Sequence, residues 1–384
     1  MHTDKIIIVG GGPVGTVLAL ALQQQGIAFT MLEARAKGAS HGDKRALALS
    51  YGSRLILEKL GIWCAVDAKA TAINTIHISQ CGGLGRTKLN ATEHNQPALG
   101  YVLSYGDLTE ALDKALDTSH VLYEAEATEI MPGESFAQVK YHQQGEQKAL
   151  KSSLSVVADG GRSLGDIEGI ERETKEYGHD ALVSKVRAEL PHSNIAYERF
   201  TPQGPMALLP NGAHDFSLVW TGEKTSIDAL LALDETTFLT QLHEAFGDRV
   251  GKFLSIEKRM TFPLKLSTLK PATATHLVVI GNAAQTMHPV AGQGFNMGLR
   301  DAWTLADLIV NTPQVAVGSA SMLNSYSQRR KRDTRGGVVF TDLLVNLFSN
   351  DLIGVSSLRG LGLGLLDIIK PAKSLIVSKM SFGK

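Results

Sequence analysis

The chain of 384 residues has little cysteine. Only Cys64 and Cys81 occur, and neither belongs to a CxxC motif or to a Cys/His cluster. This scarcity excludes a disulfide framework and a structural zinc site, and it fits a reducing cytoplasm. An excess of charge of one sign is also absent, since lysine plus arginine and aspartate plus glutamate number 38 each. We therefore expect no metal site and no nucleic-acid partner.

Long hydrophobic runs are missing as well. No stretch of about 18 uninterrupted apolar residues occurs, so the chain should not span a bilayer. Asp4 and Lys5 directly precede the first apolar segment, and no small-residue cleavage site follows it, which argues against an export signal. With 43% hydrophobic and 20% charged residues, the sequence is typical of a globular protein with a large core. We expect a cytoplasmic location, with peripheral attachment to the inner face of the membrane left open.

The hydrophobic pattern predicts parallel structure at both ends of a long middle region. Residues 6–9 form an apolar run, residues 13–25 have helical spacing, and residues 29–32 are apolar again, which predicts a βαβ unit. A buried strand at 277–280 precedes a glycine-rich turn and a helix over 294–309. Between these regions, Pro, Gly and Asn separate short β-prone segments, which predict an antiparallel sheet. These segments occupy residues 181–187, 196–201, 206–209 and 216–220.

Gly10, Gly12 and Gly15 form a GxGxxG motif between the first strand and the first helix, which opens at Pro13. The three glycines permit a tight turn, close approach of the backbone to a pyrophosphate, and close helix packing. The amino terminus of the helix presents partial positive charge to the phosphates. Glu33 ends the second strand, where its carboxylate can accept hydrogen bonds from ribose hydroxyls and would repel a 2'-phosphate. The motif predicts a dinucleotide site.

Two later segments favour FAD over NAD as the dinucleotide. Residues 156–163, VVADGGRS, run from a strand into Asp159 and Gly160, and residues 278–301, VVIGNAAQTMHPVAGQGFNMGLRD, combine a strand, a long turn and a helix. An NAD-binding domain does not need two further strand-and-turn segments from such distant parts of the chain. A flavin does need them, because its ribityl and isoalloxazine parts reach far from the first turn.

The fold class predicted is therefore α/β, with a discontinuous Rossmann-like FAD-binding domain. We assign residues 1–72, 98–175 and 270–330 to this domain. Residues 73–97 and 176–269 would form an inserted antiparallel β-sheet domain for the substrate. Residues 331–384 would form a C-terminal helical region.

The chain resembles the single-component FAD aromatic hydroxylases, those similar to 4-hydroxybenzoate hydroxylase, and within them the hydroxylases of ubiquinone biosynthesis. The resemblance runs from Lys5 to about Gly383. It is carried by IIIVGGGPVG at 6–15, GDKRALALS at 42–50, VVADGGRS, AYERFTPQGPMALLP at 196–210, GNAAQTMHPVAGQGFNMGLRD at 281–301, and the tail motifs RRKRD and FTDLLVNLFSN. The form GNAAQT, with Asn282 where most of the superfamily has Asp, is similar to the branch that hydroxylates 2-polyprenyl-6-methoxyphenol.

The resemblance also implies roles for single residues. Gly10, Gly12, Pro13, Gly15, Glu33 and Arg45 would hold the ADP half of FAD. Gly281 and Asn282 would lie beside the pyrophosphate and the ribityl chain, and Asp159 would be structural or contact the nicotinamide. The residues facing the flavin ring would be Pro289, Gly292, Gln293, Gly294, Phe295 and Asn296. Two positions depart from the family: Asp166 replaces an arginine, and Ser104, Tyr105 and Gly106 stand where relatives usually supply a basic residue.

The activity implied by the resemblance is ring hydroxylation. NAD(P)H would reduce FAD, O2 would add at flavin C4a to give a hydroperoxide, and the terminal oxygen would pass to a polyprenylated phenol. The protein would orient the ring, exclude water and stabilise charge, with the backbone amides of Gly292, Gln293 and Gly294 facing the negative charge at flavin N1 and O2. His288, beside Pro289, is a candidate acid or base because its ordinary pKa lies near neutrality; alternatively it only holds the loop.

Several residues of the middle sheet admit two interpretations. Glu198 and Arg199 could meet the substrate, or they could form the solvent face of a strand. Met206 and Leu208 could line the substrate pocket or belong to the core. Trp220 is expected in the core rather than as a stacking platform.

The tail is the one strongly charged region. Residues 329–384 hold ten Lys/Arg against four Asp, interleaved with leucines between 343 and 366. This pattern is typical of a basic amphipathic helix that binds anionic membrane or partner proteins of ubiquinone biosynthesis, or of a helix packed on the core with a solvated basic face. Other functions stay open too: a related flavin enzyme acting on another aromatic or lipid compound, or a non-catalytic subunit stabilised by FAD.

Overall fold

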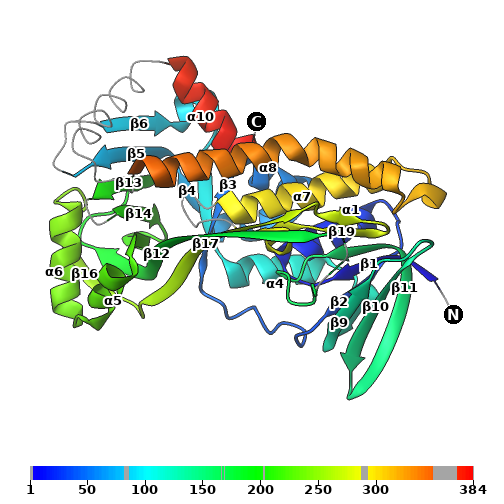
Figure 1. Ribbon diagram of the computed structural model, residues 1–384. Coiled ribbons are helices and arrows are strands. Elements are labelled where there is room, and N and C mark those ends of the chain that lie inside the picture. Colours follow the sequence, from blue (N-terminus) through cyan, green and yellow to red (C-terminus); the bar gives the residue numbers. More distant parts are fainter. Residues whose placement is uncertain are drawn as a thin grey trace.

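The computed structural model describes residues 3–81, 86–165, 167, 169–201, 204–286, 293–348 and 370–383. Two large sheets organise these residues (Figure 1). One sheet carries the first βαβ unit, and the other consists mostly of antiparallel strands from the middle of the chain. The predicted α/β fold class is confirmed.

The first βαβ unit begins with β1 (Thr3–Val9), continues through α1 (Pro13–Gln24) and ends with β2 (Thr30–Glu33). The two strands are parallel, as predicted. Proline stands in the first turn of α1, where its missing N–H leaves no hydrogen bond unmade. The four apolar residues that end β1 are at most 2% exposed, because helices and neighbouring strands cover both faces of this parallel sheet.

The nucleotide sheet has the strand order β18-β19-β11-β1-β2-β8. Its further strands are β8 (Val121–Tyr123), β9 (Ala125–Met131), β10 (Ala137–Gln143), β11 (Glu146–Val157), β18 (Thr273–Ala274) and β19 (Leu277–Val279). β11 lies parallel to β1, and β19 lies parallel to β11. The two segments that favoured FAD therefore end beside the glycine turn, at the same edge of the sheet.

A small sheet and several helices cover one face of the nucleotide sheet. The sheet consists of β3 (Ala46–Ser50), β4 (Thr71–Ile73) and β7 (Gly100–Ser104). The helices are α2 (Tyr51–Lys59), α3 (Trp63–Val66), α4 (Tyr105–Ala115) and α7 (Gln293–Val310). Ser50 and Ser104 cap α2 and α4 by accepting from a backbone amide three residues on. The helix predicted over 294–309 is confirmed.

The second sheet has nine strands in the order β20-β17-β12-β15-β14-β13-β5-β6, with β16 paired to β12. Its strands are β5 (Thr75–Gln80), β6 (Arg86–Asn90), β12 (Glu171–Ala188), β13 (Ile195–Thr201), β14 (Gly204–Pro210), β15 (Asp215–Glu223), β16 (Phe253–Ile256), β17 (Met260–Lys270) and β20 (Gln285–Thr286). The four predicted β-segments lie in β12, β13, β14 and β15. This sheet receives strands from residues 73–97 as well as from the long middle region.

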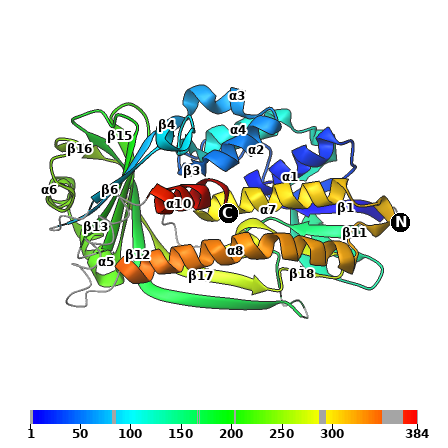
Figure 2. The same ribbon diagram turned by 90° about the horizontal axis from the view of Figure 1, so that it is seen from above.

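The two faces of the nine-stranded sheet have different coverings. Helices α5 (Lys224–Ala232) and α6 (Glu235–Phe246) pack on one face, here called the outer face. The opposite, inner face looks toward α7 and the C-terminal helix (Figure 2). An apolar core fills the space between α5, α6 and the outer face, and it includes Phe216, Trp220, Phe238 and Phe246.

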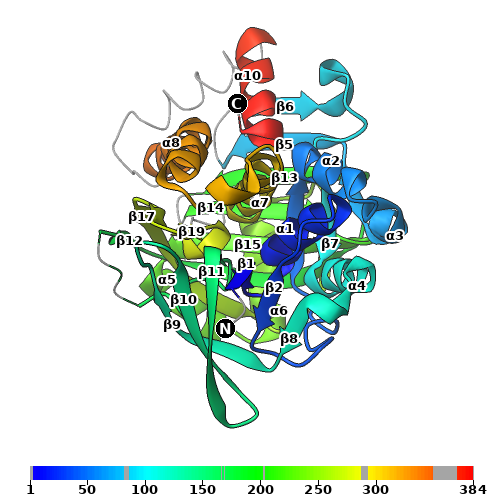
Figure 3. The same cartoon turned by 90° about the vertical axis from the view of Figure 1, so that its right-hand side faces the viewer.

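Two helices end the chain. α8 (Ala320–Phe348) crosses beside α7, and α10 (Lys370–Phe382) packs against α2, β3 and the inner face, as Figure 3 shows from the side. Val377 of α10 is 3% exposed and contacts a cluster that includes Ile73, Ile76 and Ala196. No helix among the described residues is both long and apolar enough to cross a membrane.

Candidate functional site: the dinucleotide turn and its surroundings

The glycine motif forms a turn that only glycine can make. Gly10 has a φ of +106°, and a Cβ on it would lie 2.7 Å from the backbone of Asp159. A Cβ on Gly15 would lie 2.0 Å from the carbonyl oxygen of Gly10. Gly12 is different, since only the hydroxyl of Tyr105, at 3.7 Å, lies near the position of its Cβ. The first and third glycines therefore bring the chain together, and the second leaves space above the helix terminus for a ligand.

Glu33 is held beside this turn by the groups around it. Its carboxylate accepts from the amide of Gly11 at 2.7 Å, and from the amide and Nε of Arg35 at 2.8 and 2.7 Å. Burial acts to raise the pKa of this carboxyl, but Arg35 and the backbone amides outweigh it, so the pKa is lowered from 4.5. Glu33 is therefore a charged acceptor at the end of β2, as ribose hydroxyls require.

A small pocket opens beside Glu33. Its walls come from the glycine turn, the end of β2, the loop after it and the helix α4. The lining residues include Gly11, Thr16, Met31, Glu33, Arg35, Ser40, Thr109, Asp113 and Tyr123. A mixed polar and apolar pocket at the carboxyl end of β1 and β2 is where the adenosine part of a dinucleotide binds in this type of sheet.

Tyr105 has two arginines beside it, close to the glycine turn. The guanidinium of Arg45 lies 4.9 Å from the centroid of the Tyr105 ring, and Arg45 also pairs with Asp43 at 2.5 Å. Arg35 contributes a second cation next to the same hydroxyl. Two arginines from the loops around β2 and β3 therefore lie near Gly12, each paired with a carboxylate, Arg35 with Glu33 and Arg45 with Asp43.

Asp159 lies against the glycine turn, but its carboxylate serves its own loop. One oxygen accepts from the amide of Gly161 and the other from the amide of Ser163, each at 2.8 Å. The side chain thus closes the turn after β11, which fits the structural reading of this residue. Asp166 lies outside the described residues.

The turn after β19 is fixed from behind by a buried carboxylate. Gly281 begins the short helix η4 (Gly281–Ala283) with a φ of +64°, and its amide donates to Asp301 at 3.0 Å. Asn282 is exposed and its backbone carbonyl accepts from Thr286. The free side chain of Asn282 is therefore available at this edge of the sheet.

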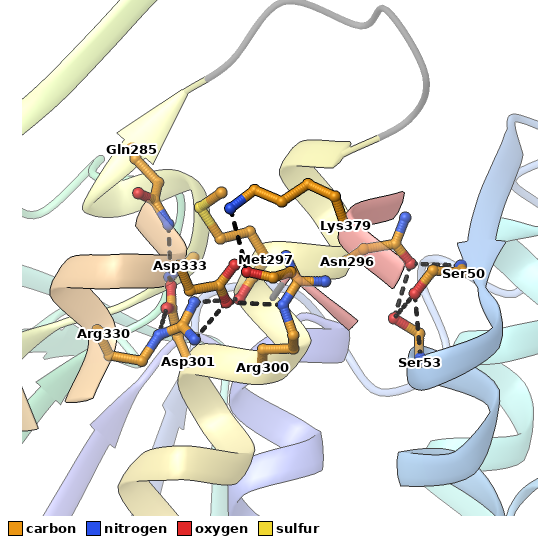
Figure 4. Close-up of polar contacts among 12 residues, drawn as sticks. Ser50, Ser53, Gln285, Asn296, Met297, Arg300, Asp301, Arg330, Asp333 and Lys379 are labelled. Carbon is orange, nitrogen blue, oxygen red and sulfur yellow. Dashed lines mark hydrogen bonds and ion pairs between the residues drawn. The ribbon is translucent and has the colours of Figure 1, made fainter. Parts of the chain in front are cut away.

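Asp301 belongs to a network of ion pairs that the sequence did not reveal (Figure 4). It accepts from Arg330 at 2.6 Å, and Arg330 also binds Asp333, which in turn accepts from Arg300 at 2.7 Å. All but Arg300 are at most 8% exposed. Burial raises the pKa of Asp301; burial also acts on Asp333, but Arg300 and Arg330 outweigh it and lower that pKa. The network ties α7 to α8 behind the η4 turn.

Side chains in the first turn of α7 contact two different parts of the fold. Gly294 is half-buried at its beginning, whereas Phe295 packs against the core around α1. Asn296, 2% exposed, accepts from the amide of Ser50 and the hydroxyl of Ser53, both at 2.7 Å, and donates to the carbonyl of Ala48 (Figure 4). The side chain of Asn296 therefore joins α7 to β3 and α2.

The remaining predicted residues of this loop cannot be placed. His288, Pro289 and Gly292 lie outside the described residues, and the side chain of Gln293 is not described. In the part of the chain that is described, no group of three or more His, Cys, Asp or Glu comes together that could hold a metal ion.

Comparison with known proteins identifies the family. The model of the FAD binding domain family matches residues 3–340. The chain is 32% identical to ubiquinone hydroxylase UbiL of Rhodospirillum rubrum, over 97% of this chain and 88% of that protein. It is 31% identical to 3-demethoxyubiquinol 3-hydroxylase of Escherichia coli, over 94% of this chain and 93% of that protein.

The chain belongs to the FAD-dependent monooxygenase family that includes these hydroxylases. Its fold agrees with that of p-nitrophenol 4-monooxygenase PnpA from Pseudomonas putida, with a TM-score of 0.79 and 16% identity over 99% of both chains. The FAD predicted from the two remote segments is the family's cofactor, and the predicted resemblance is confirmed.

The geometry of the flavoprotein fits this cofactor. The space above Gly12 and the charged carboxylate of Glu33 suit a pyrophosphate and a ribose in that order. β11 and β19 bring Asp159 and Gly281 to the same edge, where the rest of a long dinucleotide would extend.

The middle-sheet residues of this monooxygenase divide between the two faces. Met206 and Leu208 are fully buried in the core under α5 and α6, so the interpretation that they line a substrate pocket is wrong. Trp220, 3% exposed, lies in the same core, as expected. Arg199 donates to the carbonyl of Ala245 at the end of α6. Glu198 points the opposite way, to the inner face, and both residues are partly exposed.

Several basic residues of the tail, residues 329–384, are buried or paired within the fold of this enzyme. Arg330 and Lys373 are 7% and 8% exposed, and Arg329 pairs with Asp307 of α7 at 2.7 Å. The leucines between 343 and 366 have no described side chains. Among the described residues, the basic side chains therefore agree with the alternative in which the helix packs on the core.

Proposed function

We propose that this monooxygenase hydroxylates a polyprenylated phenol of the 2-polyprenyl-6-methoxyphenol type in ubiquinone biosynthesis, with NAD(P)H and O2 as co-substrates. The observation that carries the proposal is the identity of 31–32% with two ubiquinone hydroxylases over almost the full length of each chain. Similarity confined to the FAD-binding part would support a flavin enzyme only. Here the similarity includes the inserted sheet, which is the unit expected to hold the substrate.

Different residues of the chain would bind different parts of the cofactor. Gly10, Gly12, Pro13, Gly15, Glu33 and Arg45 would hold the ADP half. Asp159 would shape the adjoining loop, and Gly281 with Asn282 would contact the pyrophosphate and the ribityl chain. Bound FAD would supply the oxygen-transfer chemistry that no side chain can provide.

The start of α7 would orient and stabilise the flavin ring. The backbone amides of Gly292, Gln293 and Gly294 would point at the negative charge on the ring, because the first amides of a helix have no partner within it. Pro289, Phe295 and Asn296 would shape the surrounding wall, and His288 is the candidate proton carrier of this loop. The buried carboxylate of Asp301, through the amide of Gly281, would hold the opposite side of the site.

Quinone intermediates test the proposed function directly. In cells that lack this protein, we expect one polyprenylated phenol to accumulate and ubiquinone to fall, as measured by chromatography with mass spectrometry. The purified holoenzyme should convert that phenol with NAD(P)H and O2 to a product that contains one further oxygen atom. Unchanged quinone profiles, together with flavin reduction that yields no oxygenated product, would favour a non-catalytic subunit.

Gly294→Ala tests the assignment of the flavin-facing turn. We expect the added methyl group to crowd the flavin ring and to lower FAD content or hydroxylation. Gly42→Ala is the matched control, since nothing lies within 4 Å of the position of a Cβ on Gly42. Gly336→Ala would not serve as a control, because a Cβ on Gly336 would collide with the side chain of Lys379. Normal flavin content and normal product yield in Gly294→Ala would refute the assignment.

A further inference from the structure

Three arginines come together on the outer face of the nine-stranded sheet, near its end at β6. Arg86 of β6 lies opposite Ser79 of β5, and Ser79 lies opposite Arg199 of β13. Residues paired in this way share a face of the sheet, and Nη1 of Arg199 donates to the hydroxyl of Ser79 at 3.4 Å. Arg249 follows the end of α6, and burial together with the charges of Arg199 and Arg86 lowers its pKa, which places it near both. We call Arg86, Arg199 and Arg249 the arginine cluster.

The carboxyl end of α6 orients two members of the arginine cluster. Nε of Arg199 donates to the carbonyl of Ala245 at 2.8 Å, and Nη1 of Arg249 donates to the carbonyl of Phe246 at 3.3 Å. These carbonyls end the helix, so no amide within it satisfies them. The end of a helix carries only about half a negative charge, which cannot neutralise two guanidinium groups. The arginine cluster therefore keeps an excess of positive charge.

No carboxylate among the described residues forms an ion pair with the arginine cluster. The two acidic residues near the end of α6 do not supply one: Asp248 contacts His243 at 3.0 Å, and Glu244 is exposed. By contrast, the arginines around the dinucleotide turn and behind it each pair with a carboxylate, namely Arg35, Arg45, Arg300 and Arg330. Positive charges held together without a counter-charge repel one another, and a bound anion would relieve that repulsion.

A buried histidine beside the arginine cluster has no polar partner for one of its nitrogens. His77 shares the outer face of β5 with Ser79 and is 7% exposed, and its Nδ1 forms no hydrogen bond with another described residue. Burial, together with the charges of the arginine cluster and of Lys88 opposite it on β6, lowers the pKa of His77 to about 4. The neighbouring charges that shift this pKa are all positive, so His77 is a reporter of any anion that binds here.

We propose that the arginine cluster binds a phosphate group, carried either by a phospholipid headgroup or by a soluble phosphate compound. A phosphate group offers oxygens on several sides to converging guanidinium groups, whereas a carboxylate fills a single guanidinium fork. Ser79 adds a donor, because its oxygen accepts from Arg199 and its O–H proton stays available for an oxyanion. The inference does not depend on the proposed hydroxylation, since the sheet lies between this face and α7 (Figure 2).

Binding of inorganic phosphate to the holoenzyme is the first test. Saturating FAD keeps phosphate out of the dinucleotide site, and sodium chloride holds the ionic strength constant. We expect calorimetry to show saturable binding, and the melting temperature to rise with phosphate because the ligand binds the folded state. Bound phosphate should also raise the pKa of His77 above about 4, as followed by NMR of the histidine rings, because the anion offsets the surrounding positive charge.

Arg86→Gln and Arg249→Gln test the members of the cluster. Each variant should bind phosphate about tenfold more weakly, because it loses a hydrogen bond between two charged groups. Without phosphate, Arg86→Gln should melt no lower than wild type, since the substitution relieves repulsion. Arg187→Gln is the matched control: Arg187 is an exposed arginine of β12 and should be dispensable for phosphate binding. Equal phosphate affinity in all three variants and the wild type would overturn the assignment.

Vesicles distinguish the two sources of the phosphate group. If the ligand is a lipid headgroup, the holoenzyme should float with phosphatidylcholine vesicles that contain phosphatidic acid, and Arg86→Gln should float less while Arg187→Gln floats as the wild type does. If inorganic phosphate binds but phosphatidic acid adds nothing to flotation, the site stands with a soluble ligand. Absence of both effects would refute the phosphate site. None of these measurements uses hydroxylation, so failure here and failure of the proposed function are separate results.

Discussion

At the scale of single residues, two glutamates show how surroundings give the same side chain opposite properties. Glu33 is surrounded by donors, namely the amide of Gly11 and three groups of Arg35, and its pKa falls below 4.5. Glu198 has no donor among the described residues, and its pKa rises to about 8. The first is suited to accept hydrogen bonds from a ribose as a charged group, whereas the surroundings of the second favour the neutral acid.

Glu33→Gln should weaken FAD binding and alter the acid stability of the protein. Loss of one charged acceptor costs about 1.5 kcal/mol, roughly tenfold in Kd, as measured by titration of the FAD-free protein. A lowered pKa also means that Glu33 stabilises the folded state above pH 4.5 and that this contribution is lost as pH falls further. The unfolding free energy of Glu33→Gln should therefore depend less on pH in the acid range. Unchanged FAD affinity would contradict the ribose contact.

At the scale of elements, α7 and α8 are joined by two sets of ion pairs in different environments. Arg330, Asp301, Asp333 and Arg300 form the buried network, whereas Arg329 and Asp307 pair at the surface, each 52% exposed at the side chain. Buried pairs are costly to break because the remaining charge has no water, while exposed pairs contribute little.

Asp333→Asn should destabilise the protein by about 3–5 kcal/mol, since Arg330 and Arg300 lose a buried partner. Asp307→Asn, which breaks the exposed pair between the same two helices, should cost less than about 1 kcal/mol. Urea unfolding followed by circular dichroism measures both. Because Arg330 also binds Asp301, which holds the amide of Gly281, Asp333→Asn should lower FAD retention as well. Equal losses in the two variants would show that burial of the network is unimportant.

At the scale of the whole molecule, the C-terminal helix packs between the nine-stranded sheet and the small sheet that contains β3. α10 buries Val377 against the inner face, and a Cβ on Gly383 would lie 2.1 Å from Asp333, so the end of the chain lies on the buried network. Removal of the chain after Asp351 would therefore expose apolar surface and disturb the fold, whatever the tail does at a membrane. The peripheral membrane contact left open for this region needs a milder test.

Leu375→Asp provides that test, because Leu375 is 67% exposed on α10. If this face of α10 contacts lipid, the variant should float less with vesicles that contain anionic lipid, and its FAD content and melting temperature should stay unchanged. Val315→Asp, at an exposed position away from α10, is the matched control. Equal flotation of both variants and the wild type would exclude this helix as the contact.

The sequence by itself determined the class of fold and the identity of the cofactor. Strand, glycine turn, helix and terminal acid are local features: spacing and glycine at Gly10 and Gly15 dictate the turn, so their pattern is readable without the rest of the chain. The alternation of β-prone segments likewise predicted four strands of the middle sheet. The family resemblance supplied the aromatic hydroxylase activity.

Only the tertiary structure decided which way the middle strands face and what the charges of the tail do. A one-residue change of parity separates Glu198, on the inner face, from Arg199, Met206 and Leu208 in contact with the outer core, and periodicity alone cannot tell one face from the other. In the sequence, Arg330 and Asp333 belong to a charged run that is typical of a solvated helix face. In the structure they are buried because α7 packs against them. Burial depends on neighbours that the chain brings from far away in the sequence, and both the pKa shifts and the ion pairing follow from burial.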